Sequence, residues 1–206
     1  DVYKRQNFIM SSKNYLSIYA KSFNWAGFFL PKRTYKNCSH LYDFCRIVDN
    51  IADDEDEIEI KKIKFQKFVS DFKQKNFENP VIQNMWNIIH EFNISLEIIY
   101  DLFDGIESDI KENVKIDTRK DLLIYCYRVA GTVGLMMAKI LKVSKKQSLK
   151  SAIDLGIAMQ LTNISRDVIE DSKKNRCYIN GNFEEINSTI KLADTFYKNS
   201  FYSIRE

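Results

Sequence analysis

Apolar residues recur at helical spacing along almost the whole chain. Between residues 35 and 52, for example, Leu41, Phe44, Val48 and Ala52 follow one another at intervals of three or four residues, which places them on one face of a helix. The same spacing predicts about eight helices, over residues 14–29, 35–52, 58–77, 80–92, 95–110, 120–141, 145–171 and 184–206. Thr118 and Ser144 precede two of these helices, and both residue types commonly cap a helix start.

Residues that interrupt helices are scarce. The 206 residues include six glycines and two prolines, whereas these two types make up about 12% of an average protein. A β-sandwich or barrel needs turn residues roughly every 8–12 positions, and neither common glycine-rich phosphate loop occurs in the sequence. With no linker, internal repeat or shift in composition, the pattern predicts one all-α domain.

Charge and composition exclude several classes of protein. The net charge of +3 is too small to indicate nucleic-acid binding, and Lys and Arg are spread along the chain. The longest apolar stretch, residues 122–141, contains Arg128 and Lys139, so we expect no membrane span. The four cysteines form no CxxC pair, which predicts reduced thiols in a cytoplasmic protein.

Two pairs of aspartates stand at helical spacing on otherwise apolar helices. Asp49 and Asp53 are four residues apart, so their carboxylates lie on one helix face about 6 Å apart along the axis, and Tyr42 and Arg46 continue this stripe. A second stripe is formed by Gln160, Asn163, Asp167 and Asp171. Single pairs of this kind are common on solvated helix faces, but two such stripes together indicate a functional site.

The charges on these stripes predict a bound cation. Two carboxylates 4 Å apart repel by about 4 kcal/mol at an effective dielectric constant of 20, and a divalent cation removes this repulsion. Oxygen ligands favour Mg²⁺, which is often held by one or two carboxylates together with substrate phosphates. The stripes therefore predict a phosphorylated substrate held through Mg²⁺. The acidic run at residues 53–57 is an alternative Ca²⁺ site, but it lacks the EF-hand spacing.

Four sequence blocks together resemble the squalene/phytoene synthase family of head-to-head isoprenoid synthases, and bacterial phytoene synthases most closely. The blocks are YAKSF at 19–23, LYDFCR at 41–46 running into Asp49 and Asp53, YCYRVAGTVGLMM at 125–137, and QLTNISRDVIED at 160–171 with RCY at 176–178. They cover nearly the whole chain. The resemblance implies an isoprenoid-synthase-type helical bundle around a central cavity.

The resemblance also implies a reaction. A phytoene synthase condenses two geranylgeranyl diphosphates through prephytoene diphosphate to phytoene, in carotenoid biosynthesis. The expected cofactor is Mg²⁺, with Mn²⁺ as an alternative, and NADPH is not expected because phytoene synthases do not reduce the last cation. Squalene, dehydrosqualene or presqualene-diphosphate synthases, which use farnesyl diphosphate, are the alternative. A non-catalytic helical scaffold is a further alternative, although it would not need two acidic stripes.

The resemblance also implies roles for the residues that stand at the family's motif positions. The implied metal ligands are Asp49, Asp53, Asp167 and Asp171, and Tyr125 is implied to orient a diphosphate or to stabilise positive charge. The residues implied to bind diphosphate, directly or through metal-bound water, are Lys21, Ser22, Tyr42, Arg46, Gln160, Asn163 and Arg166. The apolar wall needed around carbocations is assigned to Phe23, Val129, Ala130, Val133, Gly134, Met137 and Leu161, for each of which ordinary core packing is the alternative.

Several departures from the family qualify the resemblance. Position 50 is Asn where the family often has Asp, but Asn50 is not on the Asp49/Asp53 stripe. Residues 1–6 read as a sequence-assembly scar, and residues 7–206 as an isoprenoid synthase domain whose C-terminal helices are missing. Because the implied substrate and product are lipids, peripheral contact with the inner face of a membrane is an alternative to a wholly cytoplasmic location. The sequence does not indicate an oligomeric state.

Overall fold

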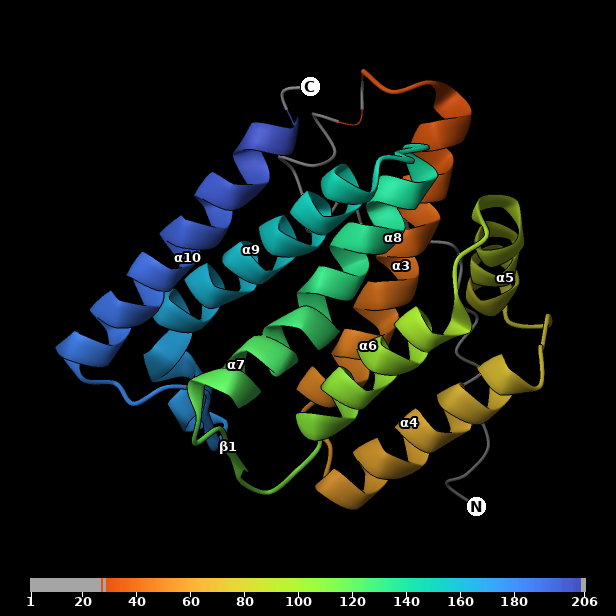
Figure 1. Ribbon diagram of the computed structural model, residues 1–206. Coiled ribbons are helices and arrows are strands. Elements are labelled where there is room, and N and C mark those ends of the chain that lie inside the picture. Colours follow the sequence, from red (N-terminus) through yellow and green to blue (C-terminus); the bar gives the residue numbers. More distant parts are fainter. Residues whose placement is uncertain (1–26, 28, 205–206) are drawn as a thin grey trace, which may run out of the picture.

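Helices make up nearly all regular structure in the part of the chain that the computed structural model describes, residues 27 and 29–204 (Figure 1). They are α3 (Lys32–Asp53), α4 (Ile58–Lys73), α5 (Pro80–Phe92), α6 (Leu96–Ser108), α7 (Arg119–Cys126), α8 (Thr132–Ile140), α9 (Lys146–Lys173) and α10 (Phe183–Ile204), with a π-helical turn η1 (Tyr127–Gly131) joining α7 to α8. The predicted all-α fold class is confirmed.

Two hydrophobic clusters fill the bundle. In the first, Phe44 of α3 packs against Phe68 and Phe72 of α4 with ring centroids 5.7 and 5.6 Å apart, and Trp86 of α5 stacks on Phe72. The second cluster lies between α7, α9 and α10, which run beside one another in Figure 1. Val129 of η1 packs against both clusters, so η1 lies where they meet.

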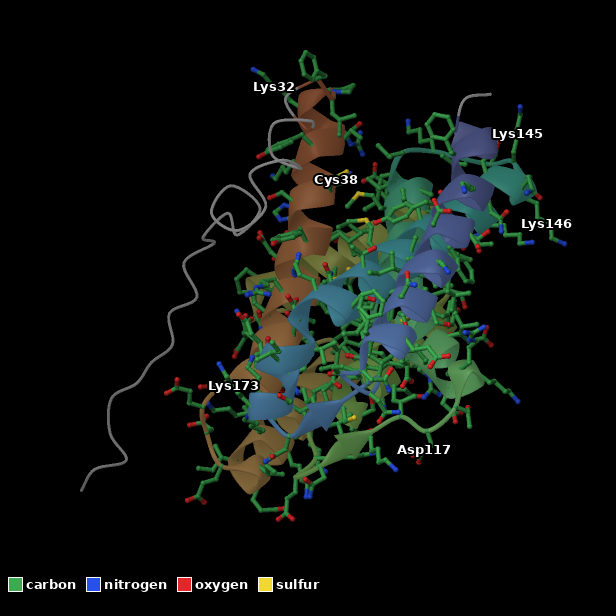
Figure 2. The ribbon with its side chains drawn as sticks, turned by 90° about the vertical axis from the view of Figure 1, so that its left-hand side faces the viewer. Lys32, Cys38, Asp117, Lys145, Lys146 and Lys173 are labelled. Carbon is green, nitrogen blue, oxygen red and sulfur yellow. The ribbon has the colours of Figure 1, made fainter. Side chains whose placement is uncertain are left out.

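Helix ends mostly follow the predicted signals. Pro80 begins α5 and Asn79 caps it, and the Thr118 side chain caps α7 by accepting from the Asp121 N–H. The prediction that Ser144 caps the next helix is wrong, because Lys145 precedes α9 without a side-chain cap. Helix α4 ends at Lys73 and not at residue 77, since Lys75 adopts a left-handed backbone conformation with φ of 57°. Figure 2 shows Lys146 and Lys173 at opposite ends of α9.

The predicted helix 120–141 is a composite of α7, η1 and α8. By length and composition its span Arg119–Ile140 could cross a membrane, contrary to the expectation that no segment could. A core helix of a bundle satisfies the same criterion, and this one packs against α6 and α9. Its π-helical turn inserts an extra residue into the helix, and such turns are frequent at functional sites.

Glycines let the composite helix touch α9 backbone to backbone. A Cβ added at Gly134 would lie 2.2 Å from the carbonyl oxygen of Ala152, and one added at Gly156 would lie 2.4 Å from that of Ala130. Both distances are far below van der Waals contact. The sequence left two explanations open for Gly134, the wall of a cavity or close helix packing, and the structure supports packing.

A short two-stranded ladder was not predicted. Strand β1 (Val114–Lys115) pairs in parallel with β2 (Arg176–Cys177), with Val114 opposite Arg176. Two residues are too few for a periodic sequence signal. The ladder fixes the segment that follows α9, and it thereby places Arg176 beside the end of α3.

Candidate functional site

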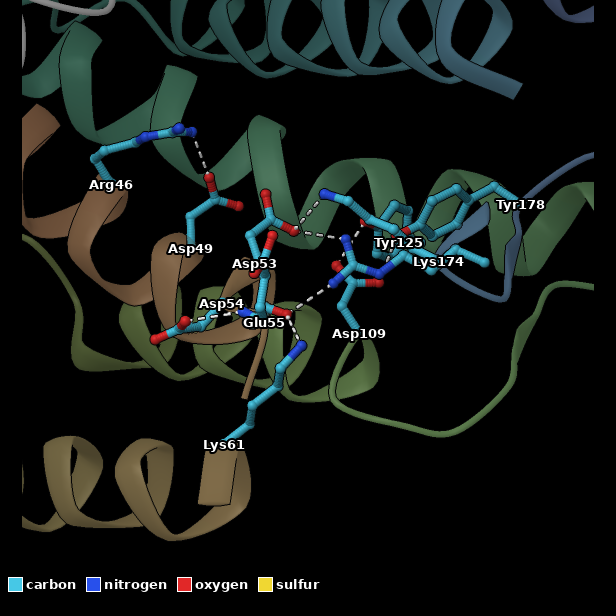
Figure 3. Close-up of polar contacts among 12 residues, drawn as sticks. Arg46, Asp49, Asp53, Asp54, Glu55, Lys61, Asp109, Tyr125, Lys174 and Tyr178 are labelled. Atoms are coloured by element: carbon cyan, nitrogen blue, oxygen red, sulfur yellow. Dashed lines mark hydrogen bonds and ion pairs between the residues drawn. The ribbon is translucent and has the colours of Figure 1, made fainter. Parts of the chain in front are cut away.

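The polar side of α3 carries the first group of predicted site residues. Phe44 and Val48 bury the other side of this helix in the core. Arg46 Nη1 donates a hydrogen bond to Asp49 Oδ2 at 2.8 Å (Figure 3). Burial raises the pKa of the Asp49 carboxyl, the nearby Asp53 raises it further, and Arg46 lowers it. Negative charge is therefore concentrated at a half-buried position, where a cation is favoured.

Asp53, the last residue of α3, is held by cations from the segment after α9. Arg176 Nη1 donates to Asp53 Oδ1 at 2.7 Å, and Arg176 Nη2 donates to the Ala52 carbonyl at 3.0 Å. Lys174 Nζ lies 3.7 Å from the same Asp53 oxygen. With its side chain only 11% exposed, Arg176 joins α3 to the end of α9 through charge-assisted hydrogen bonds.

The two aspartates of the second pair, Asp167 and Asp171, have different surroundings. Burial raises the pKa of Asp171, Asp167 and Asp53 raise it further, and Arg176 and Lys174 lower it. Asp53 and Asp171 are thus close enough to interact electrostatically. Asp167 is instead bound by its neighbour Arg166, whose Nε and Nη2 donate to its two carboxylate oxygens at 2.6 Å each. Asp171 is therefore influenced by Arg176 and Lys174, the cations that also hold Asp53.

A pocket of about 240 Å³ lies between α3, α6, the composite helix and α9. It is lined by seven predicted site residues from three separate sequence blocks, namely Tyr42, Arg46, Asp49, Tyr125, Val129, Val133 and Gln160. The remaining lining residues are Cys45, Leu102, Ile106 and Asp109. Polar groups and aliphatic side chains thus share one pocket, as in most sites for small molecules.

Four residues predicted for the cavity wall do not line this pocket, and their predicted role stays a prediction. Leu161 is fully buried in the second hydrophobic cluster, and Met137 packs against the first. Gly134 lies at the crossing with α9, where a side chain would meet the Ala152 carbonyl, and the Ala130 carbonyl lies against Gly156 at the same crossing. Helical spacing identifies residues that face inward, but it does not distinguish a pocket wall from a solid core.

Other predicted residues lie elsewhere. Asp53, Asn163, Arg166, Asp167 and Asp171 are outside the lining of this pocket. Lys21, Ser22 and Phe23, like residues 1–6, are outside the described residues. Their predicted roles stay predictions.

Sequence reasoning missed a polar cluster beside the pocket. The hydroxyls of Tyr125 and Tyr178 donate to the two carboxylate oxygens of Asp109, at 2.8 and 2.7 Å (Figure 3). Burial raises the pKa of Asp109 to about 6, although the hydrogen bonds from Tyr178 and Tyr125 lower it. Arg176 and Tyr178 belong to the RCY block and could have been found there. Asp109 and Lys174 carried no sequence signal.

The carboxylates fit Mg²⁺ as donors, but they do not form a complete cage. Among residues 27 and 29–204, no three His, Cys, Asp or Glu side chains are grouped so that they could hold a metal by themselves. Mg²⁺ retains water and often takes only one or two carboxylates, with substrate phosphates completing its shell. Asp49 and Asp53 present such a pair, and its charge is balanced here by Arg46 and Arg176.

Comparison with known proteins identifies related sequences. Residues 16–182 match the family described as Squalene/phytoene synthase. A phytoene synthase of Pseudescherichia vulneris is 32% identical over 172 residues, which are 78% of this chain and 55% of the relative. A 4,4'-diapophytoene synthase of Staphylococcus haemolyticus is 32% identical over 193 residues, covering 87% of this chain and 67% of the relative.

Solved structures show the same architecture. A crystal structure of a dehydrosqualene synthase in complex with ligand superposes with a TM-score of 0.77 at 26% identity, covering 93% of this chain and 75% of that chain. The squalene synthase HpnC from Alicyclobacillus acidocaldarius, at 18% identity, shares the fold with a TM-score of 0.76 over 91% of this chain and 79% of that one. The chain spans only 55–59% of the length of three phytoene synthase relatives.

Proposed function

We propose, because the chain belongs to the squalene/phytoene synthase family, that the whole protein is a prenyltransferase that joins two prenyl diphosphates head to head. We further propose geranylgeranyl diphosphate as its substrate and phytoene as its product, in carotenoid biosynthesis. Relatives named phytoene synthase, at 30–32% identity, support this choice. A diapophytoene synthase and a presqualene diphosphate synthase are equally similar, so farnesyl diphosphate is the alternative substrate.

The observation that supports this function is the composition of the pocket. Arg46 and Asp49 from α3, Tyr125 from α7 and Gln160 from α9 converge beside the aliphatic side chains of Leu102, Ile106, Val129 and Val133. A prenyl diphosphate has the matching character, a charged head and an apolar tail. At about 240 Å³ the pocket is below the roughly 300–1,000 Å³ of complete ligand sites, so we infer that it holds the region around the reacting carbons.

The cofactor proposed for this site is Mg²⁺, with Asp49 and Asp53 as ligands on α3 and Asp167 and Asp171 as ligands on α9. When bound, the ion acts as a Lewis acid on the diphosphate leaving group. The protein side chains perform the remaining tasks. With a metal bound, the carboxylates would not need Arg46, Arg176 and Lys174 to neutralise them. These cations are then available to bind diphosphate oxygens, and each arginine can do so with two parallel hydrogen bonds.

Product analysis tests the proposed substrate. The whole protein that contains this chain is incubated with Mg²⁺ and either geranylgeranyl or farnesyl diphosphate, and the hydrocarbon is identified by mass spectrometry. We expect a C40 hydrocarbon from geranylgeranyl diphosphate. A C30 product formed from farnesyl diphosphate alone would contradict the phytoene assignment but keep the head-to-head reaction.

Removal of divalent cations tests the metal. Treatment with a chelator is expected to abolish turnover, and added Mg²⁺ should restore it. Calorimetry gives a second readout that does not depend on turnover, since inorganic diphosphate should bind measurably tighter with Mg²⁺ than without it. Equal binding with and without Mg²⁺, together with full activity in chelator, would contradict the metal proposal.

A further inference from the structure

Asp109 is a half-buried carboxylate at the pocket, and the proposed function has given it no role. It follows directly after α6 and lines the pocket together with Tyr125. Each of its two oxygens accepts one phenol hydroxyl, from Tyr125 at 2.8 Å and from Tyr178 at 2.7 Å. These contacts join the end of α6 to α7 and to the segment just after β2.

The two tyrosines are held rigidly as a pair. Their rings stack with centroids 4.7 Å apart and an interplanar angle of 23°. Tyr125 is 8% exposed and Tyr178 is 6% exposed. A ring packed on both its face and its hydroxyl has little freedom to rotate, so the orientation of Tyr125 depends on Asp109 and on Tyr178.

The hydrogen bond decides which part of the Tyr125 hydroxyl remains for a substrate. A phenol has one proton to donate, and here Tyr125 donates it to Asp109. Only the oxygen lone pairs remain for any other group in the pocket. An oxygen fixed in this way stabilises a neighbouring positive charge, because its dipole is aligned before the charge develops.

We propose that Asp109 is a positioning residue, which orients the Tyr125 hydroxyl directly and through Tyr178 so that an oxygen lone pair faces the carbocations formed in the pocket. The inference rests on the proposed function. Asp109 acts only through the tyrosines, since both of its carboxylate oxygens are already engaged by their hydroxyls. The proposal therefore assigns it no direct contact with a metal or with the diphosphate.

The test is Asp109→Asn in the whole protein. The amide keeps the shape of the side chain but replaces one acceptor oxygen by a donor, so one of the two tyrosine hydroxyls must turn around. We expect kcat to fall on the order of 10- to 100-fold, because a small misplacement of a catalytic group has effects of this size. The KM for the prenyl diphosphate should stay within about twofold. The proposal gives Asp109 no contact with the diphosphate, so the substitution should not change substrate binding.

A matched control lies close by, on α6 and η1. Asp101 of α6 accepts a hydrogen bond from the Tyr127 hydroxyl of η1 at 2.9 Å, but neither residue lines the pocket. Asp101→Asn therefore removes the same kind of contact between neighbouring helices and should leave kcat unchanged. An equal loss of kcat in both variants would show that Asp109 acts through general stability, and this would overturn the proposal.

A double-mutant cycle tests whether Asp109 works through Tyr125. In a Tyr125→Phe background there is no hydroxyl to orient, so Asp109→Asn should cause little further loss of kcat. If the fold-losses of kcat in the two single variants multiplied in the double variant, the two residues would act independently, and the proposal would be overturned. Should Asp109→Asn fail to fold, Tyr178→Phe removes one of the two hydroxyls held by Asp109, and an unchanged kcat in that variant would also overturn it.

Wild-type turnover is measured first, so that a failure of the proposed function can be distinguished from a failure of the inference about Asp109. Formation of neither a hydrocarbon nor a joined cyclopropyl diphosphate from either prenyl diphosphate would contradict the proposed function, and this inference would fall with it. Wild-type turnover combined with an unaltered kcat in Asp109→Asn would contradict this inference alone.

Discussion

Asp49→Asn is expected to lower kcat/KM of the whole protein for its prenyl diphosphate on the order of 10²- to 10³-fold, the effect of removing one well-placed electrostatic group from an active site. Asp49 lines the pocket and lies within hydrogen-bond distance of Arg46, at 2.8 Å. The amide has nearly the same volume but no charge. It therefore weakens the proposed site for Mg²⁺ while leaving the helix intact.

The control for this experiment is Asp54→Asn, on the first residue after α3. Asp54 is exposed, and its partners are Lys64 and the Glu55 N–H. We expect near wild-type turnover, because an exposed ion pair contributes only about 0–1 kcal/mol to stability. Asp167→Asn tests the second stripe in the same assay. Wild-type turnover in both Asp49→Asn and Asp167→Asn would defeat the metal proposal.

Gly134→Ala is expected to lower the melting temperature of the protein by roughly 2–10 °C, corresponding to about 1–3 kcal/mol of overpacking. The new Cβ would lie 2.2 Å from the Ala152 carbonyl oxygen, which belongs to the backbone of α9 and cannot rotate away. Helices α8 and α9 must therefore separate. Within an exposed helix the same substitution would stabilise the protein by up to about 1 kcal/mol, so the sign of the effect is diagnostic.

Gly181→Ala is the matched control for the helix crossing. Its added Cβ would meet only the Val168 side chain, at 3.2 Å, and Gly181 does not have a positive φ. We expect a change of stability within about 0.5 kcal/mol, as for most substitutions away from such contacts. Differential scanning calorimetry measures both variants. A higher melting temperature for Gly134→Ala would show that the two backbones are not in contact at this crossing.

Local patterns predicted most of the helices because each pattern acts within a few residues. Helix α5 begins and ends where Pro80 and Phe92 suggested, since a proline at the first helical position and an apolar face are both local signals. The end of α4 was missed because Lys75, a non-glycine residue, adopts a left-handed conformation there. Composition does not reveal such a residue.

The candidate site was predicted wherever its residues share a helix. Tyr42, Arg46 and Asp49 are neighbours on α3 by spacing alone, and the structure places them on one pocket with Tyr125 and Gln160. Asp109 was missed because it stands at a helix end among exposed acidic residues, and no periodicity separates it from them. Its partners Tyr125 and Tyr178 are 16 and 69 residues away.

The sequence by itself determined the helical class and the two acidic stripes, because hydrophobic spacing and i,i+4 neighbours are properties of a single helix. Only the tertiary structure decided which stripe residues share a pocket. The β1–β2 ladder places Arg176 against Asp53. The backbone contacts at Gly134 and Gly156 set how closely the composite helix approaches α9. Both depend on contacts between distant segments, whose geometry follows from the packing of the whole bundle and from no local pattern.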